Sequence, residues 1–180
     1  MKRKIMWLGA SALAGAITMA AAAAAQTGFP EYPGKDWPIY SGSYNAQRFS
    51  TLKQVTPANA RDLETKWIYH IPGLRQMEGV PVVANGVMYV SGFNRIDALD
   101  ARTGNVIWKY QRKPAVATFQ RGAAVANNKV YITTTDGHIL ALDARTGAEL
   151  WMSKGGPKLA YSGNAPFIAG GKIIITGNRP

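Results

Sequence analysis

The chain has 180 residues, with 21 Lys and Arg against 10 Asp and Glu, a formal net charge of +11 and no cysteine. The lack of cysteine excludes a disulfide framework, zinc–thiolate and iron–sulfur sites, and a covalently attached haem within these residues. The positive charges beyond the N-terminus are scattered singly. They favour a solvated surface that attracts an acidic partner, and not a nucleic-acid-binding patch.

The N-terminus has the pattern of an export signal. A basic run at residues 2–4 precedes an uncharged, alanine-rich stretch at residues 6–25, and residues 23–25 offer an A-x-A cleavage site. This pattern predicts a secretory signal peptide over residues 1–25. An uncleaved membrane anchor is the alternative, since the stretch approaches the length of a span, but its alanine and glycine content makes it weakly hydrophobic. We expect a periplasmic protein with no stable membrane span after cleavage.

The segment after the leader lacks regular periodicity. Residues 26–36 are rich in Gly and Pro, which predicts an extended lead-in. A short helical turn is expected at residues 56–63, where Thr56 would cap the turn and Pro57 suits its first position. Residues 63–69 then alternate between apolar and polar side chains, which predicts a strand.

A seven-residue segment then occurs twice in the chain. The sequence ALDARTG at residues 98–104 returns at residues 141–147, 43 residues later, and each copy is followed four residues after its Gly by a tryptophan, Trp108 or Trp151. An apolar strand signal precedes each copy, and a third such signal lies at residues 173–175. A period near 43 residues built from short strands is the spacing of a β-propeller blade.

The second repeat shows how one blade is expected to form. Its predicted strands lie at residues 130–134, 138–142 and 148–151. An Asp-Gly turn at residues 136–137 joins the first two strands, because Gly tolerates the positive φ of a tight hairpin. A longer turn joins the next two, in which Asp143 can bond the backbone two residues on and Gly147 can adopt the left-handed conformation.

Three tryptophans mark equivalent places in this repeat. Trp67, Trp108 and Trp151 are spaced by 41 and 43 residues, and each is expected to lie between neighbouring sheets. We predict an all-β fold, a β-propeller of repeated four-stranded blades, with about three to four blades in this chain. A single sandwich would lack the long repeat, and a β-helix would have a shorter one. A closed ring needs roughly four to eight blades, so we expect residues 37–180 to be the N-terminal part of an incomplete propeller.

Candidate binding residues stand just before the predicted inner strands, where a propeller meets its central channel. Glu78, Arg121 and Gly163 hold the same place, within one residue, in three consecutive blades, and Ser162 is adjacent to the third. Arg offers a bidentate, permanently charged fork for a carboxylate or quinone oxygen, and Glu can accept from a ring N–H. The alternative is that Glu78 and Arg121 form an ion pair or remain solvated on loops, and both interpretations stay open here.

No other catalytic signature is present in the sequence. There is no G-x-G-x-x-G, P-loop or G-x-S-x-G pattern, and His70 and His138 lie far apart without a cluster of ligand residues. Four aspartates are expected to be turn formers in or beside hairpins: Asp97, Asp100, Asp136 and Asp143.

Several stretches together resemble the pyrroloquinoline-quinone (PQQ) dependent alcohol and methanol dehydrogenases. The likeness covers residues 36–180. Its motifs are DWP at 36–38 with RFSTLKQV at 48–55, EGVP at 78–81 with MYV at 88–90, RG at 121–122 with TDGHILALDA at 135–144, NAP at 164–166 and GN at 177–178. In order, the opening motif, E-G-x-P and R-G make this resemblance specific.

The resemblance implies an eight-bladed, exported quinoprotein that oxidises an alcohol or related substrate and passes electrons to a cytochrome c. PQQ would lie on the propeller axis with a calcium or lanthanide ion. Glu78 matches the family Glu that hydrogen-bonds PQQ, and Arg121 matches the family Arg at its quinone side. Ser162 is a cofactor-binding candidate, because Gly163 replaces the family Thr. The metal ligands and the catalytic Asp of the family lie beyond residue 180, so no catalytic or metal residue is assigned here.

A further departure and one alternative accompany this resemblance. Ala115 and Val116 stand where most alcohol-oxidising members have two adjacent cysteines. The alternative is a cofactor-free propeller scaffold for protein–protein interaction in the cell envelope. Such scaffolds carry a lipidation cysteine, which this chain lacks, and have no reason to place Glu78 and Arg121 on the axis. We expect this chain to be inactive as an enzyme on its own.

Overall fold

The computed structural model describes residues 34–74, 76–113, 120–154 and 163–176. The predicted leader, Ala115, Val116 and Ser162 lie outside these described residues. In the part of the chain that the structure describes, no helix is long and apolar enough to span a membrane.

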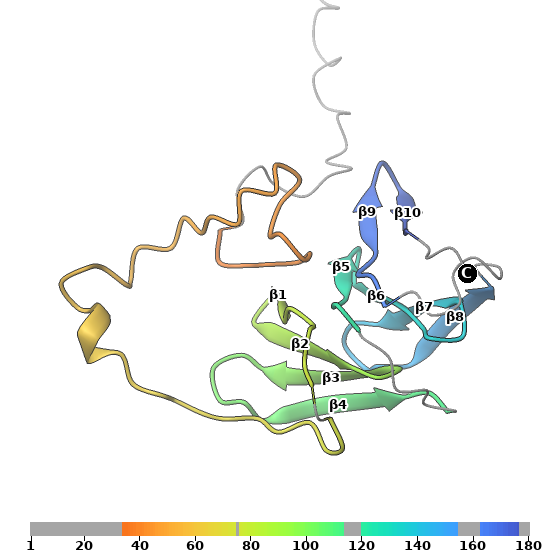
Figure 1. Ribbon diagram of the computed structural model, residues 1–180, viewed down its shortest axis with the longest axis horizontal. Helices are drawn as coiled ribbons and strands as arrows, with labels where there is room; N and C mark the ends of the chain where they lie inside the picture. Colours follow the sequence, from red (N-terminus) through yellow and green to blue (C-terminus); the bar gives the residue numbers. More distant parts are fainter. Residues whose placement is uncertain (1–33, 75, 114–119, 155–162, 177–180) are drawn as a thin grey trace, which may run out of the picture.

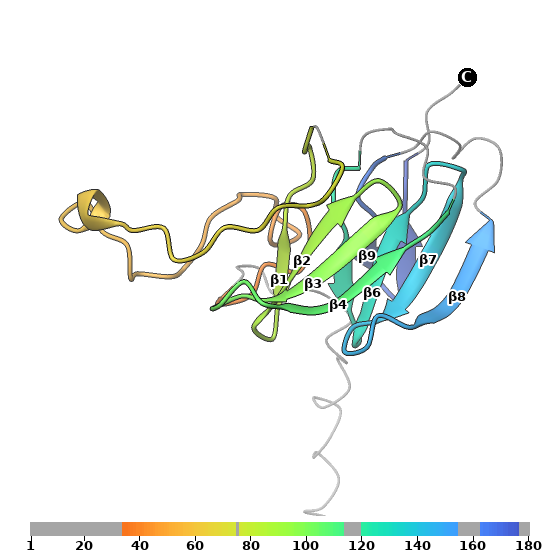
Figure 2. The ribbon, with the colours of Figure 1, turned by 90° about the horizontal axis from the view of Figure 1, so that it is seen from below.

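Two four-stranded antiparallel sheets and the beginning of a third make up the fold (Figures 1 and 2). The first sheet has the order β1 (Val82–Ala84), β2 (Val87–Gly92), β3 (Arg95–Asp100) and β4 (Val106–Gln111). The second has the order β5 (Ala124–Ala126), β6 (Lys129–Thr133), β7 (His138–Asp143) and β8 (Glu149–Lys154). The third contains β9 (Phe167–Ala169) and β10 (Lys172–Ile174). The predicted repeat of four-stranded blades is confirmed.

The two complete sheets share the same register. In each, the pairing between the third and fourth strands shifts by one residue beside the tryptophan, between Ala98 and Leu99 in β3 and between Ala141 and Leu142 in β7. Such a bulge bends the outer strand and increases its twist. Because the irregularity recurs at the same repeat position, the duplicated sequence specifies the strand geometry as well as the turn.

The turn between the third and fourth strands forms as expected from its sequence. The Asp143 carboxylate accepts hydrogen bonds from the N–H groups of Arg145 and Thr146, at 3.0 and 2.8 Å, and Gly147 has φ of 74°. Asp100 makes the same pair of contacts in the first sheet, both at 2.9 Å. Hydrogen bonds from Thr146 hold the pKa of the Asp143 carboxyl below its usual range. The ionised carboxylate therefore organises this turn.

Trp108 joins the first sheet to the second. Its indole N–H donates to the carbonyl of Ala144 at 3.0 Å, and its ring covers Gly147, where an added Cβ would lie 2.6 Å from the ring. Tyr89 packs against the same indole at a centroid distance of 5.8 Å, and Trp108 is 9% exposed. The predicted burial of this tryptophan between two sheets is confirmed.

Trp67 makes the matching contact on the opposite face of the first sheet. Its indole N–H donates to the Ala101 carbonyl at 3.3 Å, and its ring lies 2.7 Å from the place of a Cβ on Gly104. The residues around Trp67 are extended with alternating exposure, but residues 63–71 form no strand pairing within the described part of the chain. The predicted strand at residues 63–69 is therefore only an extended segment here, since a strand needs a hydrogen-bonded neighbour.

The hydrophobic core lies between the sheets. Residues of both sheets contribute to its larger cluster, which includes Val82, Ile96, Trp108, Val130, Leu140 and Leu142. A second cluster lies between the second sheet and the start of the third, and contains Ile39, Ala124, Tyr131, Ala141 and Ile168. The inner strands are nearly all apolar and carry small residues, which allows neighbouring sheets to approach closely near their convergence.

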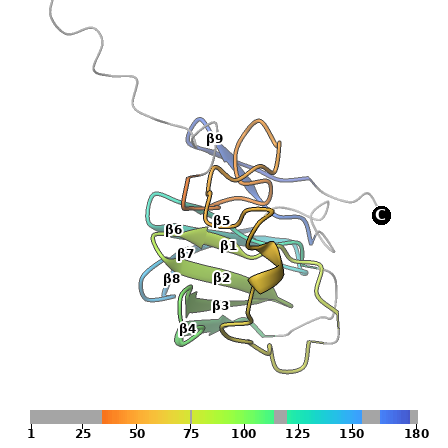
Figure 3. The ribbon, with the colours of Figure 1, turned by 90° about the vertical axis from the view of Figure 1, so that its left-hand side faces the viewer.

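The helical turn expected after Pro57 is shorter and later than predicted. A 3₁₀-helix, η1 (Ala60–Asp62), begins after Asn59, and this segment lies outside the first sheet, away from the second (Figures 1 and 3). Thr56 does not cap the turn as an acceptor. Instead, its N–H and hydroxyl donate to the side-chain oxygen of Asn59 at 2.7 and 3.1 Å.

Candidate functional site

The inner strands of the three sheets converge on one side of the molecule. Strand β1 contacts β5, and β5 contacts β9, whereas the outer strands β4 and β8 splay apart (Figure 1). The chain just before these strands is linked through the backbone. Val80 N–H donates to the Arg121 carbonyl at 3.3 Å, and Arg121 N–H donates to the Gly163 carbonyl at 2.7 Å. The structure thus brings together the three equivalent positions that the sequence selected.

Glu78 and Arg121 form an ion pair at this place. Arg121 Nε lies 3.6 Å from Glu78 Oε2, with the two side chains 53% and 30% exposed. Gln76 donates from Nε2 to the other Glu78 oxygen at 3.3 Å. An ion pair this exposed contributes about 1 kcal/mol or less to stability. Because a guanidinium has five N–H donors and this contact uses Nε, Arg121 retains donors for a ligand.

Arg121 also lines a cavity of about 330 Å³, called here the axial cavity. Its wall combines the start of the third sheet with residues 40–46. The lining residues are Tyr40, Ser41, Ser43, Ala46, Arg121, Asn164, Ala165, Pro166, Phe167 and Thr176. Asn164 is held by hydrogen bonds from its amide to the backbone and hydroxyl oxygens of Thr176, at 3.3 and 2.7 Å. One cation, several hydroxyls and two aromatic rings suit a planar ligand with anionic groups.

A close approach of two chain segments positions the ion pair. A Cβ on Gly79 would lie 2.6 Å from Ser91 Oγ and 3.0 Å from the Gln120 carbonyl oxygen. Glycine at residue 79 therefore lets the segment carrying Glu78 lie against the segment carrying Arg121. Ser91 Oγ and both polar atoms of the Gln120 side chain are buried and have no hydrogen-bond partner among the described residues. Buried polar groups that lack partners are uncommon in folded proteins.

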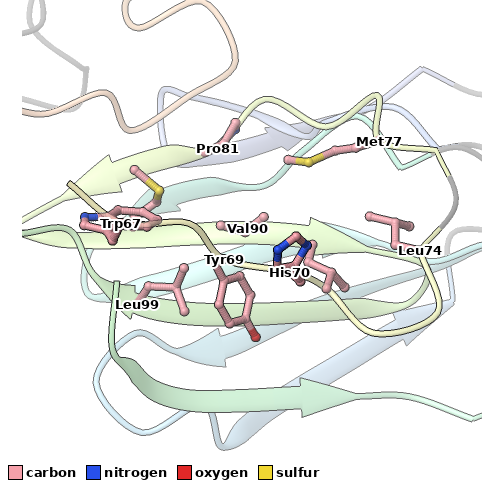
Figure 4. A pocket seen from close by; sticks show the side chains of 10 residues that line it. Trp67, Tyr69, His70, Leu74, Met77, Pro81, Val90 and Leu99 are labelled. Atoms are coloured by element: carbon pink, nitrogen blue, oxygen red, sulfur yellow. The ribbon is translucent and has the colours of Figure 1, made fainter. Parts of the chain in front are cut away.

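A second cavity, of about 320 Å³, has a different character (Figure 4). It lies between the extended segment around Trp67 and the face of the first sheet. Mostly apolar side chains line it: Trp67, Tyr69, His70, Ile71, Leu74, Met77, Pro81, Met88, Val90 and Leu99. Its lining residues include no Arg, Lys, Asp or Glu, in contrast to the axial cavity, which Arg121 lines.

Asp97 is not a turn former, contrary to the sequence analysis. It lies within β3 and is fully buried, accepting hydrogen bonds from the Tyr69 hydroxyl at 2.6 Å and Arg95 Nε at 2.8 Å. Burial, together with the hydrogen bond to this carboxylate, raises the pKa of Tyr69 to about 12. The spacing of Arg95 and Asp97, two residues apart on one strand face, was the available signal. This buried cluster connects residues 63–71, called here the Trp67 segment, to the first sheet.

The aspartate of the Asp-Gly turn links the two complete sheets. Arg112, after β4, donates to Asp136 Oδ2 at 2.5 Å, and His138 Nδ1 lies 3.2 Å from the same oxygen. Burial alone would raise the pKa of Asp136, but hydrogen bonds from Arg112 and Thr134 outweigh it and hold that pKa well below its usual range. Within the described ranges, no group of three or more His, Asp or Glu residues is placed to hold a metal ion.

Comparison with known proteins identifies the fold and relates the chain to a family of dehydrogenases. Repeated four-stranded sheets joined by tryptophan contacts around converging inner strands define the blades of a β-propeller. Residues 37–122 match the family model of the glucose/ethanol/alcohol dehydrogenase β-propeller domain. Residues 37–122 are thus similar to the β-propeller domain of these dehydrogenases.

Individual relatives show the same similarity. The chain is 40% identical over 114 residues to the dehydrogenase subunit of a quinone alcohol dehydrogenase from Gluconobacter oxydans, an alignment that covers 58% of this chain and 15% of that protein. The crystal structure of the quinohemoprotein alcohol dehydrogenase from Comamonas testosteroni superposes with a TM-score of 0.70 at 35% identity, covering 83% of this chain and 23% of that one. A europium-containing methanol dehydrogenase superposes with a TM-score of 0.67 at 31% identity, covering 77% and 26%. The chain thus matches about a quarter or less of the length of these relatives.

Proposed function

We propose that the protein to which this chain belongs is a PQQ-dependent dehydrogenase that oxidises an alcohol-type substrate, and that this chain supplies one wall of its PQQ site. The observation that carries the proposal is the Glu78–Arg121 ion pair, whose arginine lines the axial cavity, on the residues that match the family motif. When bound, PQQ supplies a quinone that is reduced as the alcohol is oxidised.

The residues of this chain would bind and orient the cofactor. The Arg121 guanidinium can donate to a carboxylate or quinone oxygen through the N–H groups that Glu78 does not use. The Glu78 carboxylate can accept a ring N–H while its charge keeps the guanidinium in place, 3.6 Å away. Gly79 keeps the two segments close enough for both contacts. Charge-assisted hydrogen bonds of this kind are about twice as strong as neutral ones.

Binding of PQQ by the full-length protein tests this proposal. Arg121→Ala should raise the PQQ dissociation constant roughly 10- to 100-fold, since hydrogen bonds to charged groups contribute about 1.5–3 kcal/mol. Arg121→Lys should recover part of the loss because it restores the charge without the fork. Arg102→Ala, in an exposed turn, is the matched control and should leave the dissociation constant unchanged. Fluorescence quenching by added PQQ provides the measurement.

The opposite result would favour the scaffold alternative. If the unsubstituted full-length protein shows no saturable PQQ binding, the chain is a cofactor-free member of the fold. A protein that binds PQQ equally well with Arg121→Ala and Glu78→Gln would retain the family function without these two residues.

We further propose that the site includes a calcium or lanthanide ion, whose ligands come from outside the described residues, and that electrons leave to a cytochrome c. Support comes from the relatives: one neighbour is a europium-containing methanol dehydrogenase, and one relative is a 1-butanol dehydrogenase (cytochrome c) from Thauera butanivorans. Activity of the full-length protein after chelation, then with added Ca²⁺ or La³⁺, should distinguish the two metals. Reduction of cytochrome c in the same assay tests the acceptor.

Export to the periplasm is proposed from the basic and alanine-rich leader at residues 1–25. N-terminal sequencing of the protein from cells should begin at Gln26, and an intact Met1 would contradict the proposal. We also expect residues 26–180 alone not to reduce a dye with alcohol and PQQ, because the groups assigned here bind the cofactor and include no catalytic base. Turnover by that segment would contradict this expectation.

A further inference from the structure

The segment around Trp37 and Pro38 crosses the free edges of the inner strands. Trp37 and Val83 exchange two backbone hydrogen bonds, at 2.6 and 2.9 Å, along the free edge of β1. One residue further, the Pro38 carbonyl accepts a 2.8 Å hydrogen bond from Val125 N–H in β5. An edge strand with unpaired N–H and C=O groups is a site of unwanted pairing unless something covers it. Residues 36–44, called here the axial segment, cover two such edges.

Side chains of the axial segment extend these contacts to the third sheet. Ile39 is 1% exposed and belongs to the core cluster between the second and third sheets. The Tyr44 hydroxyl donates to the Ile168 carbonyl in β9 at 2.6 Å, and its ring meets Phe167 edge-on at 5.1 Å. At the other end, the Asp36 carboxylate accepts the N–H of Asn85 in the β1–β2 turn at 3.1 Å. The axial segment therefore holds three consecutive blades at their inner strands (Figure 1).

The same segment lines the axial cavity. Tyr40, Ser41 and Ser43 face the space that Arg121 borders from the second sheet. Arg48 lies over the Tyr40 ring at 5.1 Å from its centroid, which orients the ring by a cation–π contact. Tyr40 has the only aromatic ring that the axial segment contributes to the lining of this cavity, which Arg121 also borders.

We propose that the axial segment forms one wall of the PQQ cavity, across the inner strands of the three described sheets, and that Tyr40 sets the space available to the cofactor. This inference rests on the proposed function, because it takes PQQ as the occupant of the cavity. It assigns two roles to one segment: backbone pairing that closes the inner edges, and a ring that positions the cofactor against Arg121.

Two variants separate the roles in the full-length protein. Tyr40→Ala shortens the wall without touching the backbone pairing, so the PQQ dissociation constant should rise about tenfold while Val83 and Val125 amide exchange stays unchanged. Ile39→Ala loosens the anchor of the segment, so exchange of both amides should accelerate at least tenfold and the dissociation constant should rise as well. Leu52→Ala, exposed and outside the cavity lining, is the control for both measurements.

The possible results have separate meanings. If both variants bind PQQ as tightly as the unsubstituted protein, the segment only covers strand edges and this inference is wrong, while the proposed function stands. If Ile39→Ala leaves exchange at Val83 and Val125 unchanged, the segment does not close the edges through this anchor, and the inference is wrong at that step. If the unsubstituted protein binds no PQQ, the proposed function itself fails.

Discussion

The two tryptophan contacts on the first sheet use the same local chemistry in different surroundings. Trp108 and Trp67 each cover the glycine of a repeat turn and donate to a carbonyl three residues before it, Ala144 or Ala101. Trp108, however, lies in β4, paired along its length with β3, and is 9% exposed. Trp67 lies in an extended segment without strand pairing in the described part of the chain.

The difference separates what the repeat sequence specifies from what a neighbouring sheet supplies. The turn presents a carbonyl and a glycine surface, and any correctly placed indole can bind them. Full burial and a fixed position require that the indole also belong to a paired strand. Trp151 lies in β8, paired with β7, and is 37% exposed in the described part of the chain, so strand pairing alone does not bury an indole. The contribution of each tryptophan contact to the free energy of unfolding should therefore differ, although the sequence motif is the same.

The largest effect is expected from removing the tryptophans themselves. Trp108→Ala should lower the free energy of unfolding by about 4 kcal/mol, the range for truncating a buried large aromatic side chain. Trp67→Ala should cost about half as much, because its segment can rearrange and its ring is only partly buried. Urea unfolding of both variants measures the difference. Equal losses would show that Trp67 is as firmly held as Trp108, and the comparison would then be wrong.

The glycines under the two rings should give the next largest effect. Gly147→Ala places a Cβ 2.6 Å from the Trp108 ring at a residue with φ of 74°. Overpacking against a fixed ring and the left-handed backbone together should cost about 3 kcal/mol. Gly104→Ala has the same backbone strain, but the Trp67 segment can shift, so about 1–2 kcal/mol is expected. Thermal unfolding of the pair provides the test, with Gly34→Ala, which meets no atom within 4 Å, as control.

The sequence predicted the parts of this molecule that local chemistry determines. The Asp143 turn, the Gly147 conformation, the strand order and the place of Trp108 all follow from the duplicated segment. The repeat spacing also placed Glu78 and Arg121 at equivalent positions in consecutive blades. In the structure, Arg121 Nε lies 3.6 Å from Glu78 Oε2. Whether they bind a cofactor is not decided by that distance, so their role stays a prediction.

Other features depend on contacts between segments far apart in the chain. Asp97 resembles its turn-forming neighbours in sequence, but it is buried because Tyr69, from 28 residues earlier, closes over it. The sequence of the axial segment has no strand or helix periodicity, because the segment belongs to none of the three sheets. It instead forms hydrogen bonds with the inner strand of each sheet. The strand expected at residues 63–69 is unpaired for a related reason. Its sequence alternates as a strand does, but no neighbouring strand forms hydrogen bonds with it in the described part of the chain.

The two tyrosines that follow the tryptophans sharpen the comparison through their pH dependence. Tyr69 donates to the fully buried Asp97, and Tyr110 donates to the exposed Glu149 at 2.7 Å. Burial and these carboxylates raise the pKa of each phenol to about 12. The folded state thus holds the phenolic protons more tightly than the unfolded state, where the pKa is about 10. Their contribution to stability is complete below pH 10 and is lost as the pH rises to about 12.

Phenylalanine substitutions should show which tyrosine contributes more to the free energy of unfolding. Tyr69→Phe leaves the buried Asp97 carboxylate with Arg95 as its remaining side-chain partner, so we expect a loss of about 1–3 kcal/mol at pH 7. It should also flatten the decline in stability between pH 10 and 12. Tyr110→Phe should cost about 0.5 kcal/mol at pH 7, because water can replace the hydroxyl at Glu149. If Tyr69→Phe proves the milder change, the buried Asp97 cluster does not hold the Trp67 segment, and that segment depends on the indole contact alone.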